Sequence, residues 1–398
     1  MIGTLQPVRA RTRTRLRVKL TIAAITISAC LLLVEIGARV ATMPQRNGLS
    51  RISRIVLLPF RPEPPAPGTS APGWEGSYIV EDPELGWCVA PNAHGQQARS
   101  NAHAARGGPP SGYSRQVPPG KVRVLTFGDS FTHCDDVSDE ETWQAQLQPL
   151  RGDVEAVNFG VPAFGTDQAF LRWRRESAKL DSTVSLLCIW PEDICRNLSL
   201  DGFYLAPMGV SRAKPRFVLT DGRLRVIGVP CMTPEQRRVA IADPLRVELL
   251  RSDHWMRADE VEWRAWYHVR TLRLLASTLT MLARRDERMA MYRGTDPTAN
   301  DITLAICRQF AAEAAVRGTR PVVVLIPMRD LLEEFPGGER CLPLVRQLMA
   351  AGIETWDLSP AFASAPDLDM LNQRQQHMTP RGNRRIAELL AERLPAPH

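Results

Sequence analysis

Residues 122–130 read VRVLTFGDS, a largely apolar run that ends in glycine, aspartate and serine. Branched and aromatic residues bounded by a turn are typical of a buried strand. Two more such runs follow at residues 154–159 (VEAVNF) and 183–189 (TVSLLCI), and helix-compatible sequence lies at 139–150 and 167–179. Strand, helix, strand, helix, strand is the order of a parallel sheet with crossover helices. The sequence therefore predicts an α/β fold, with a central parallel sheet between two layers of helices.

An insertion interrupts this alternation between about residues 198 and 295. Residues 216–229 (RFVLTDGRLRVIGV) predict a hairpin that turns at Asp221 and Gly222, because Asp-Gly is a preferred two-residue turn. Residues 234–292 have a helical pattern. We expect the aromatic residues of this segment to pack it against the main domain, and a lid over a substrate is the alternative. These aromatic residues are Trp255, Trp263, Trp266 and Tyr267.

The α/β pattern then resumes and continues towards the end of the chain. Its clearest strand is the apolar run PVVVLIP, which follows a helical segment. We expect residues 78–398 to form one domain that contains the insertion. The predicted elements after the insertion are a helix at 302–317, a strand at 321–327, a helix at 342–351, a strand at 353–358 and a helix at 380–394.

The first 19 residues hold most of the net charge. The full sequence has a formal charge of +7, and residues 1–19 contribute +6 through arginine and lysine without any acid. A nucleic-acid-binding domain needs a basic surface on its folded part. Because the remaining residues sum to only about +1, nucleic acid is not expected as a partner.

Residues 20–34 (LTIAAITISACLLLV) form an uncharged apolar run directly after this basic arm. A basic flank before an apolar run keeps the amino terminus in the cytoplasm and leads the following chain across the membrane. The run reaches the length of a membrane span, about 20 residues, if Glu35 and Arg39 lie at the far interface. We therefore predict a cytoplasmic arm at 1–19 and a single-pass signal anchor at 20–41, in the lipid bilayer of a bacterial inner membrane.

Three alternatives to an uncleaved anchor remain open. They are a cleaved signal peptide, a lipoprotein processed at Cys30 and a buried core helix. A linker is predicted at 42–77, because the stretch 59–73 (PFRPEPPAPGTSAPG) holds six prolines. The domain at 78–398 would then lie in the periplasm or another extracytoplasmic space.

No cofactor and no metal are predicted. The sequence has no HExxH, Walker or GxGxxG motif, and its eight cysteines form no CxxC pair or zinc-like cluster. We expect most of these cysteines to be small buried apolar residues.

Four short motifs lie where strands end or the last helix begins. The GDS motif that ends at Ser130 follows the first strand, at the edge of the sheet where α/β folds bind ligands. A serine there can present its hydroxyl while its own N–H contributes to an oxyanion hole. Gly160 follows the second strand, Glu192 follows the third, and His377 precedes the last helix. An imidazole at that position could reach across the strand ends.

This order of motifs resembles the SGNH, or GDSL-type, hydrolases. The segments DPELGWCVAPN at 82–92, NFGVPAFGTDQ at 158–168 and PRFVLTDGRLRV at 215–226 look like a bacterial, membrane-anchored branch of that superfamily. The similarity covers roughly residues 78–395. It implies a three-layer, flavodoxin-like sandwich and a serine enzyme that cleaves carboxylic esters.

The resemblance also implies a mechanism. Ser130 would attack an acyl carbonyl, and His377 would take the serine proton and return it to the leaving alcohol. The backbone N–H groups of Ser130 and Gly160 would hold the oxyanion. The family's third oxyanion donor is an asparagine side chain, and Glu192 occupies its position.

Two positions therefore depart from the family pattern. A carboxylate at Glu192 cannot donate, and loss of one oxyanion donor costs roughly 10²–10³ in rate, unless burial keeps the acid protonated. The family places an aspartate two or three residues before its histidine, where this chain has Gln375 and Arg374. Asp369 or Asp367 is the predicted substitute, and a histidine oriented by a backbone carbonyl is the alternative. Loss of the orienting carboxylate costs roughly 10⁴, so we expect a slow enzyme.

These observations predict a membrane-tethered esterase or deacylase that acts on an acylated carbohydrate or another small ester. An envelope polysaccharide O-acyltransferase is the first alternative, in which a sugar hydroxyl replaces water in the second step. A degenerate domain that binds a glycan or a partner protein without turnover is the second.

Overall fold

The computed structural model describes residues 8–42, 51–53, 55–62, 77–207, 211–334, 343–363 and 377–397. The chain divides into two compact units. The first contains Met1–Arg61 and Asp259–Ala283, and the second contains Pro62–Ala258 and Arg284–His398. The four motifs that carry the proposed chemistry all belong to the second unit.

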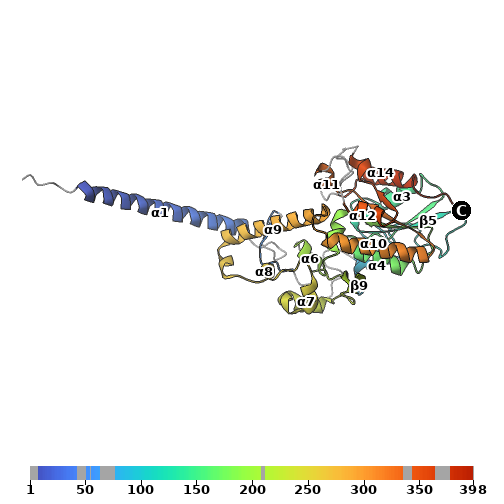
Figure 1. The fold of residues 1–398 in the computed structure, drawn as a ribbon, viewed down its shortest axis with the longest axis horizontal. Coiled ribbons are helices and arrows are strands. Elements are labelled where there is room, and N and C mark those ends of the chain that lie inside the picture. The colour runs from blue at the N-terminus through green and yellow to red at the C-terminus, as the bar shows by residue number, and fades with distance from the viewer. Residues whose placement is uncertain are drawn as a thin grey trace, which may run out of the picture. The chain divides into compact units, whose positions relative to one another are not determined.

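A five-stranded parallel sheet forms the centre of the second unit (Figure 1). The strand order is β11-β10-β7-β5-β6, and every neighbouring pair is parallel. Every residue of β5 and β7 is buried. The predicted α/β fold is therefore confirmed, and all five predicted strands belong to this sheet. They are β5 (Val122–Phe127), β6 (Val154–Asn158), β7 (Val184–Ile189), β10 (Arg320–Leu325) and β11 (Thr355–Asp357).

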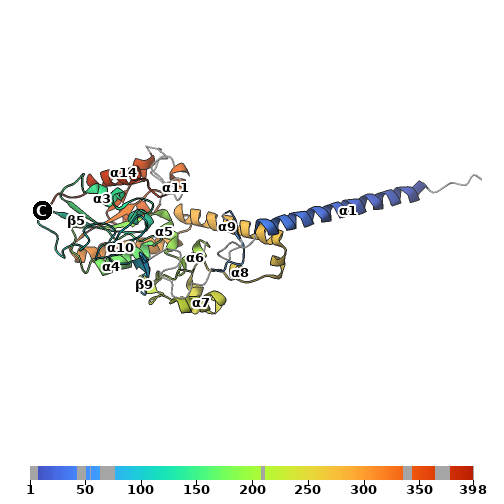
Figure 2. The same ribbon diagram turned by 180° about the vertical axis from the view of Figure 1, so that it is seen from behind.

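Helices cover both faces of this sheet. Figures 1 and 2 show α3 (Trp143–Leu147) and α14 (Pro380–Ala391) on one side of the strands. On the other side lie α4 (Thr166–Glu176) and α10 (Thr298–Val316), joined by the rings of Trp173 and Phe310, 5.1 Å apart. These layers form the expected sandwich. A further helix, α12 (Pro343–Ala350), packs against α10 and β11.

The helix predicted at 139–150 is shorter and divided. Asp139–Glu141 form a single 3-10 turn, η1, and α3 begins at Trp143. Thr142 between them has an extended backbone, and its hydroxyl accepts the N–H of Ala145. Because a capping threonine starts a new helix, it separates the two turns.

Two hairpins flank the sheet. The predicted one consists of β8 (Arg216–Thr220) and β9 (Arg223–Ile227), and both residues of its Asp221-Gly222 turn have positive φ, as a tight hairpin turn requires. The other, β3 (Ile79–Asp82) and β4 (Gly86–Val89), follows from none of the patterns above. Its Trp87 indole N–H donates to the carbonyl of Pro162 at 2.9 Å, so this hairpin supports the loop after β6.

In the first unit, the long helix α1 (Val8–Ala41) contacts the start of α9 (Arg270–Tyr292). The Glu35 carboxylate accepts the first two N–H groups of α9, at 2.8 and 2.9 Å. Within α1, the segment Arg15–Ala41 is long and apolar enough to cross a membrane. A signal sequence has the same properties, so the uncleaved anchor stays a prediction.

Part of the predicted linker at 42–77 is packed. β1 (Arg51–Ile52) pairs with β2 (Ile55–Val56), and the Leu58 N–H donates to the hydroxyl of Ser277 on α9 at 3.0 Å. The apolar residues of this stretch are shielded from water, which stabilises the packed form over an extended chain. The buried residues are Val56, Leu57, Leu58 and Phe60. Residues 43–50 and 63–76 of the predicted linker lie outside the described residues.

The aromatic residues of the insertion do not form one group. Trp255 belongs to the second unit and is fully buried, with its indole N–H donating to the carbonyl of Cys195 at 3.0 Å. Trp263 and Trp266 belong to the first unit and are 48% and 39% exposed, with buried Tyr267 in ring contact with both. Trp255 therefore packs within the second unit, and the other three residues pack within the first.

Candidate active site

Ser130 is the first residue of α2 (Ser130–His133), a one-turn helix that follows β5 almost directly. The side chain of Asp129 caps this helix by accepting the N–H of Phe131 at 2.9 Å. The first N–H groups of a helix have no acceptor inside it, so the fold leaves the Ser130 N–H without an intrahelical partner. This turn presents the serine at the carboxyl edge of the sheet, 7% exposed.

His377 lies beside Ser130, three residues before α14 begins. Its Nε2 is 2.8 Å from the Ser130 hydroxyl oxygen. The imidazole packs on the ring of Phe131, with centroids 4.9 Å apart, and Phe131 in turn stacks on Trp190 at 4.6 Å. Two residues that the sequence analysis selected on separate motifs are thus brought into hydrogen-bond contact.

The other imidazole nitrogen reaches an aspartate that the sequence analysis missed. Nδ1 of His377 is 2.9 Å from the Asp136 carboxylate. Because a carboxylate only accepts, Nδ1 carries the proton, and Nε2 is left to accept the serine hydroxyl. Asp136 lies six positions after Ser130, in the sequence THCDD, and the adjacent acids were the signal that could have identified it.

The predicted orienting acids Asp369 and Asp367 lie outside the described residues, as do Arg374 and Gln375. The carboxylate that the structure places at His377 Nδ1 is that of Asp136, and Asp369 as the orienting acid stays a prediction. The alternative of a histidine oriented by a backbone carbonyl is not what the structure shows, because the group at Nδ1 is a carboxylate.

Gly160 follows β6 and packs directly against α2. A Cβ atom at this position would overlap the backbone nitrogen of His133, so only glycine permits this approach. The N–H of Gly160 donates to the Asn158 side-chain oxygen at 2.9 Å. The N–H that we predicted for the oxyanion is therefore engaged within the protein, and Gly160 as an oxyanion donor stays a prediction.

Glu192 is the second residue of helix α5 (Pro191–Arg196), and its side chain lies near a cation. Its carboxylate lies 3.6 Å from the guanidinium of Arg288. With Arg196, Arg212 and other residues, it lines a cavity of about 200 Å³. A carboxylate in this position accepts hydrogen bonds and donates none, so Glu192 gives no counterpart to the family's asparagine.

A buried cluster of charged side chains contacts Asp129, the residue directly before Ser130. The Arg196 guanidinium donates to Asp129 at 3.2 Å and to Asp193 at 2.7 Å. Burial raises the pKa of the Asp129 carboxyl, against the opposing effect of Arg196. Burial, with the neighbouring Asp129 charge, raises the pKa of Asp193 well above its usual range. This cluster was also missed, since buried ion pairs leave no spacing signature.

A second imidazole, His133, lies three residues from Ser130 but is fully engaged. Its Nδ1–H donates to Asp135 at 2.5 Å, and its Nε2 accepts the Tyr78 hydroxyl at 2.9 Å. Burial lowers the pKa of His133, which favours the neutral ring. With both nitrogens occupied, His133 is not placed to act on Ser130.

Among the described residues, no three His, Cys, Asp or Glu side chains are grouped as a metal ion would require. The expectation that no metal or cofactor takes part stays a prediction.

Comparisons with known proteins add a fold likeness. No protein-family model matches the sequence, and no match is found among curated proteins. Solved structures that match include a member of the lipolytic protein G-D-S-L family from Veillonella parvula DSM 2008, with 11% identity over 68% of this chain and 97% of that chain, and a TM-score of 0.34. LAE5, an alpha/beta hydrolase enzyme from the metagenome of Lake Arreo, Spain, matches with 12% identity over 69% of this chain and 95% of its own, and a TM-score of 0.35. At these values neither structure carries an argument about activity, which rests on the geometry above.

Proposed function

We propose that the chain is a carboxylic ester hydrolase of the SGNH type, with Ser130 as nucleophile, His377 as base and Asp136 as the orienting acid. The observation that carries this proposal is the unbroken hydrogen-bond chain from the serine hydroxyl through the imidazole to the carboxylate, at 2.8 and 2.9 Å. The same constellation performs acyl transfer on unrelated folds, where geometry rather than sequence order identifies it.

In the proposed reaction, the Ser130 oxygen attacks the ester carbonyl while His377 Nε2 takes its proton. Asp136 holds the imidazole in the tautomer that can accept, and it stabilises the imidazolium that forms. His377 then returns the proton to the leaving alcohol, which gives an acyl-serine. A water molecule, deprotonated by the same imidazole, hydrolyses that intermediate and releases the acid.

The proposed oxyanion donors are the backbone N–H groups of Ser130 and Gly160. The first opens α2, where helix geometry leaves it without an acceptor. The second now donates to the Asn158 side-chain oxygen, and it would have to break this hydrogen bond to donate to the oxyanion. With Glu192 unable to donate, at most two of the family's three donors would serve the oxyanion, which supports a slow enzyme rather than a fast general esterase.

The proposed substrate is an acylated carbohydrate or another small polar ester at the cell envelope. The cavity beside Glu192 supports this class, because its volume of about 200 Å³, lined by both charged and apolar side chains, suits a small ester better than a long acyl chain. The proposed location is the outer side of a bacterial inner membrane, which rests on the apolar segment Arg15–Ala41. An O-acyltransferase remains the alternative, since transfer to a sugar hydroxyl uses the same three residues.

The proposal is tested on the full chain in detergent. A fluorophosphonate probe and a p-nitrophenyl acyl ester series are applied to the parent, to Ser130→Ala and to the control Ser114→Ala. We expect labelling and turnover in the parent and in Ser114→Ala, and neither in Ser130→Ala. A folded parent without labelling or turnover would make the non-catalytic alternative the better one. Transfer of the acyl group to an added sugar, in place of hydrolysis, would favour the transferase.

A further inference from the structure

We propose that Arg106 is the positioning residue for Asp136. Its side chain holds residues 133–137 in the conformation in which the Asp136 carboxylate reaches His377. This inference rests on the proposed function, because it explains how the orienting acid of that triad is placed.

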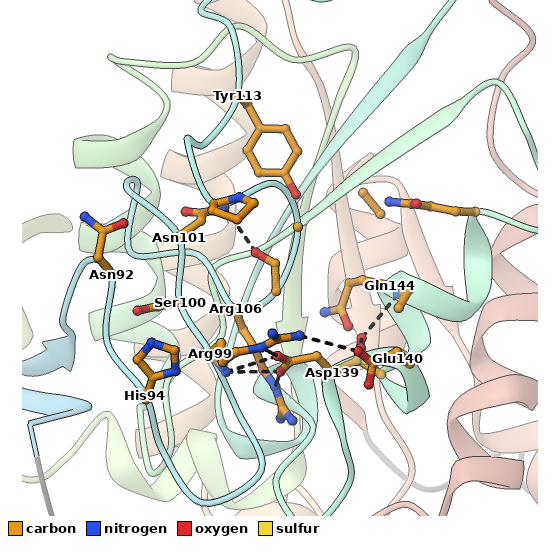
Figure 3. A pocket seen from close by; sticks show the side chains of 17 residues that line it. Asn92, His94, Arg99, Ser100, Asn101, Arg106, Tyr113, Asp139, Glu140 and Gln144 are labelled. Carbon is orange, nitrogen blue, oxygen red and sulfur yellow. Dashed lines mark hydrogen bonds and ion pairs between the residues drawn. The ribbon is translucent and has the colours of Figure 1, made fainter.

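The Arg106 guanidinium has five N–H donors, and each of them has an acceptor. Three of these acceptors are carbonyl oxygens of the last residue of α2 and of the loop that follows it, and they bracket Asp136 on both sides. The remaining two are the carbonyl of Gln97 in an earlier loop and the carboxylate of Asp139, and Figure 3 shows Asp139 beside Arg106. The acceptors are His133 O at 2.8 Å, Cys134 O at 2.6 Å, Val137 O at 2.5 Å, Gln97 O at 3.2 Å and Asp139 Oδ1 at 2.9 Å.

The loop needs such support, because two of its residues have backbone conformations that are unfavourable for residues with a side chain. Cys134 has φ of 66° and Asp136 has φ of 72°, the left-handed region that residues with a side chain rarely adopt. Conformations of this kind persist only where surrounding contacts over-determine them. The carbonyls on either side of Asp136 point inward to Arg106, so the carboxylate is turned outward to the imidazole.

Arg106 is itself held in place through both its backbone and its guanidinium group. Its backbone N–H donates to Asn158 O at the end of β6, at 2.8 Å, and the Asn158 side chain also donates to His133 O at 3.3 Å. Its guanidinium pairs with Asp139, which also accepts the N–H of Arg99 at 3.1 Å. Arg99, Arg106 and Asp139 line a cavity of about 500 Å³, shown in Figure 3. Arg106 is 5% exposed, so little water competes for its donors.

Substitution by lysine is a sharp test at this position. Lysine keeps the charge but offers three donors on a flexible stem, so it cannot reproduce a planar fork that engages five acceptors. Arg123 provides a matched control. It is also buried, and it donates to the carbonyls of Ser114, Arg115 and Asp181 at the opposite end of β5 from Ser130.

The experiment is a double-mutant cycle on the full chain, with p-nitrophenyl acetate as substrate. The variants are Arg106→Lys, Asp136→Asn, the two combined, and the control Arg123→Lys. We expect Arg106→Lys to lower kcat by about 10²-fold, because a displacement near 1 Å has about that effect, while KM changes less than about threefold. In the Asp136→Asn background, the same substitution should change kcat by less than about threefold.

An equal loss of kcat in both backgrounds, or an unchanged kcat in Arg106→Lys, would overturn the inference. A second measurement does not need turnover and separates this inference from the proposed function. The low-field proton resonance of the His377 Nδ1–H should be present in the parent and in Arg123→Lys, and absent in Asp136→Asn. It should be lost in Arg106→Lys, and its retention there, or its absence from the parent, would overturn the positioning role. If Arg106→Lys does not fold, Asp139→Ala removes one of the five acceptors and should weaken the same resonance, whereas an unaltered resonance would count against the role.

Discussion

The Asp136 carboxylate lies 2.9 Å from His377 Nδ1, although the two residues are 241 positions apart in the sequence. The family pattern that this chain resembles places the acid just before the histidine. In this structure the carboxylate at Nδ1 belongs instead to the loop that follows α2, the helix that begins with Ser130. The imidazole is oriented in the same way from either source, because only the position of the carboxylate relative to Nδ1 matters for the tautomer.

The first prediction concerns Asp136. Asp136→Asn should lower kcat by roughly 10³–10⁴, since an amide can donate to Nδ1 and favour the wrong tautomer. KM for a nitrophenyl ester should change little. The neighbouring Asp135→Asn is the control, because Asp135 contacts His133 rather than His377. Similar losses of kcat in the two variants would mean that Asp136 has no special role.

The second prediction concerns the contact between Gly160 and α2. Gly160→Ala should lower the free energy of unfolding by about 1–3 kcal/mol and abolish turnover, because its Cβ would displace the backbone that carries Ser130. Gly152→Ala is the control, since a Cβ there meets no atom within 4 Å. Urea unfolding and nitrophenyl ester hydrolysis measure the two effects. An active and stable Gly160→Ala would contradict this close approach.

The third prediction concerns Glu192. Glu192→Asn should raise the hydrolysis rate, by up to about 10-fold, because it replaces an acceptor with a donor at the family's third oxyanion position. Stability should change by less than about 1 kcal/mol, since the pair with Arg288 is long and partly exposed. Steady-state kinetics decide the matter. A lower rate would assign Glu192 a role of its own in binding or catalysis.

The fourth prediction concerns stability at mildly acidic pH. Burial lowers the pKa of His133 from its ordinary value of 6.5, so below that pH the unfolded chain binds a proton that the folded chain does not. The contribution of His133 to stability should therefore be constant above about pH 6.5 and should fall as the pH is lowered below it. His133→Gln should remove this part of the pH dependence. Urea midpoints between about pH 5 and 8 test it, and identical slopes in both proteins would exclude His133 as the cause.

The fifth prediction concerns the amino terminus. If α1 is an uncleaved anchor, mass spectrometry of the natively produced protein should find residues 1–41 intact and the protein in the membrane fraction. A new amino terminus at a lipidated Cys30 would show a lipoprotein instead. Cleavage after the apolar run, with a soluble product, would show a signal peptide.

Much of the fold followed from local patterns. The strands at 122–127, 154–159 and 183–189 were predictable because buried parallel strands are apolar along their whole length. The hairpin turn at Asp221 and Gly222 was predictable because few residue pairs adopt its backbone conformation. The division of the helix at 139–150 was not predictable. A threonine within a helical pattern can cap a new helix, and periodicity alone does not show whether it does so. The packing of residues 55–60 was not predicted, because the prolines that follow them are typical of an extended linker.

The sequence by itself determined which residues stand at the carboxyl edge of the sheet. Ser130, Gly160 and Glu192 each follow a strand, and parallel strands bring their ends to one edge whatever the side chains are. Only the tertiary structure decided what those residues contact. Asp136 reaches His377 through a left-handed loop held by Arg106, and Gly160 gives its N–H to Asn158. Such contacts depend on angstrom-scale packing between segments far apart in the chain, which local spacing does not encode.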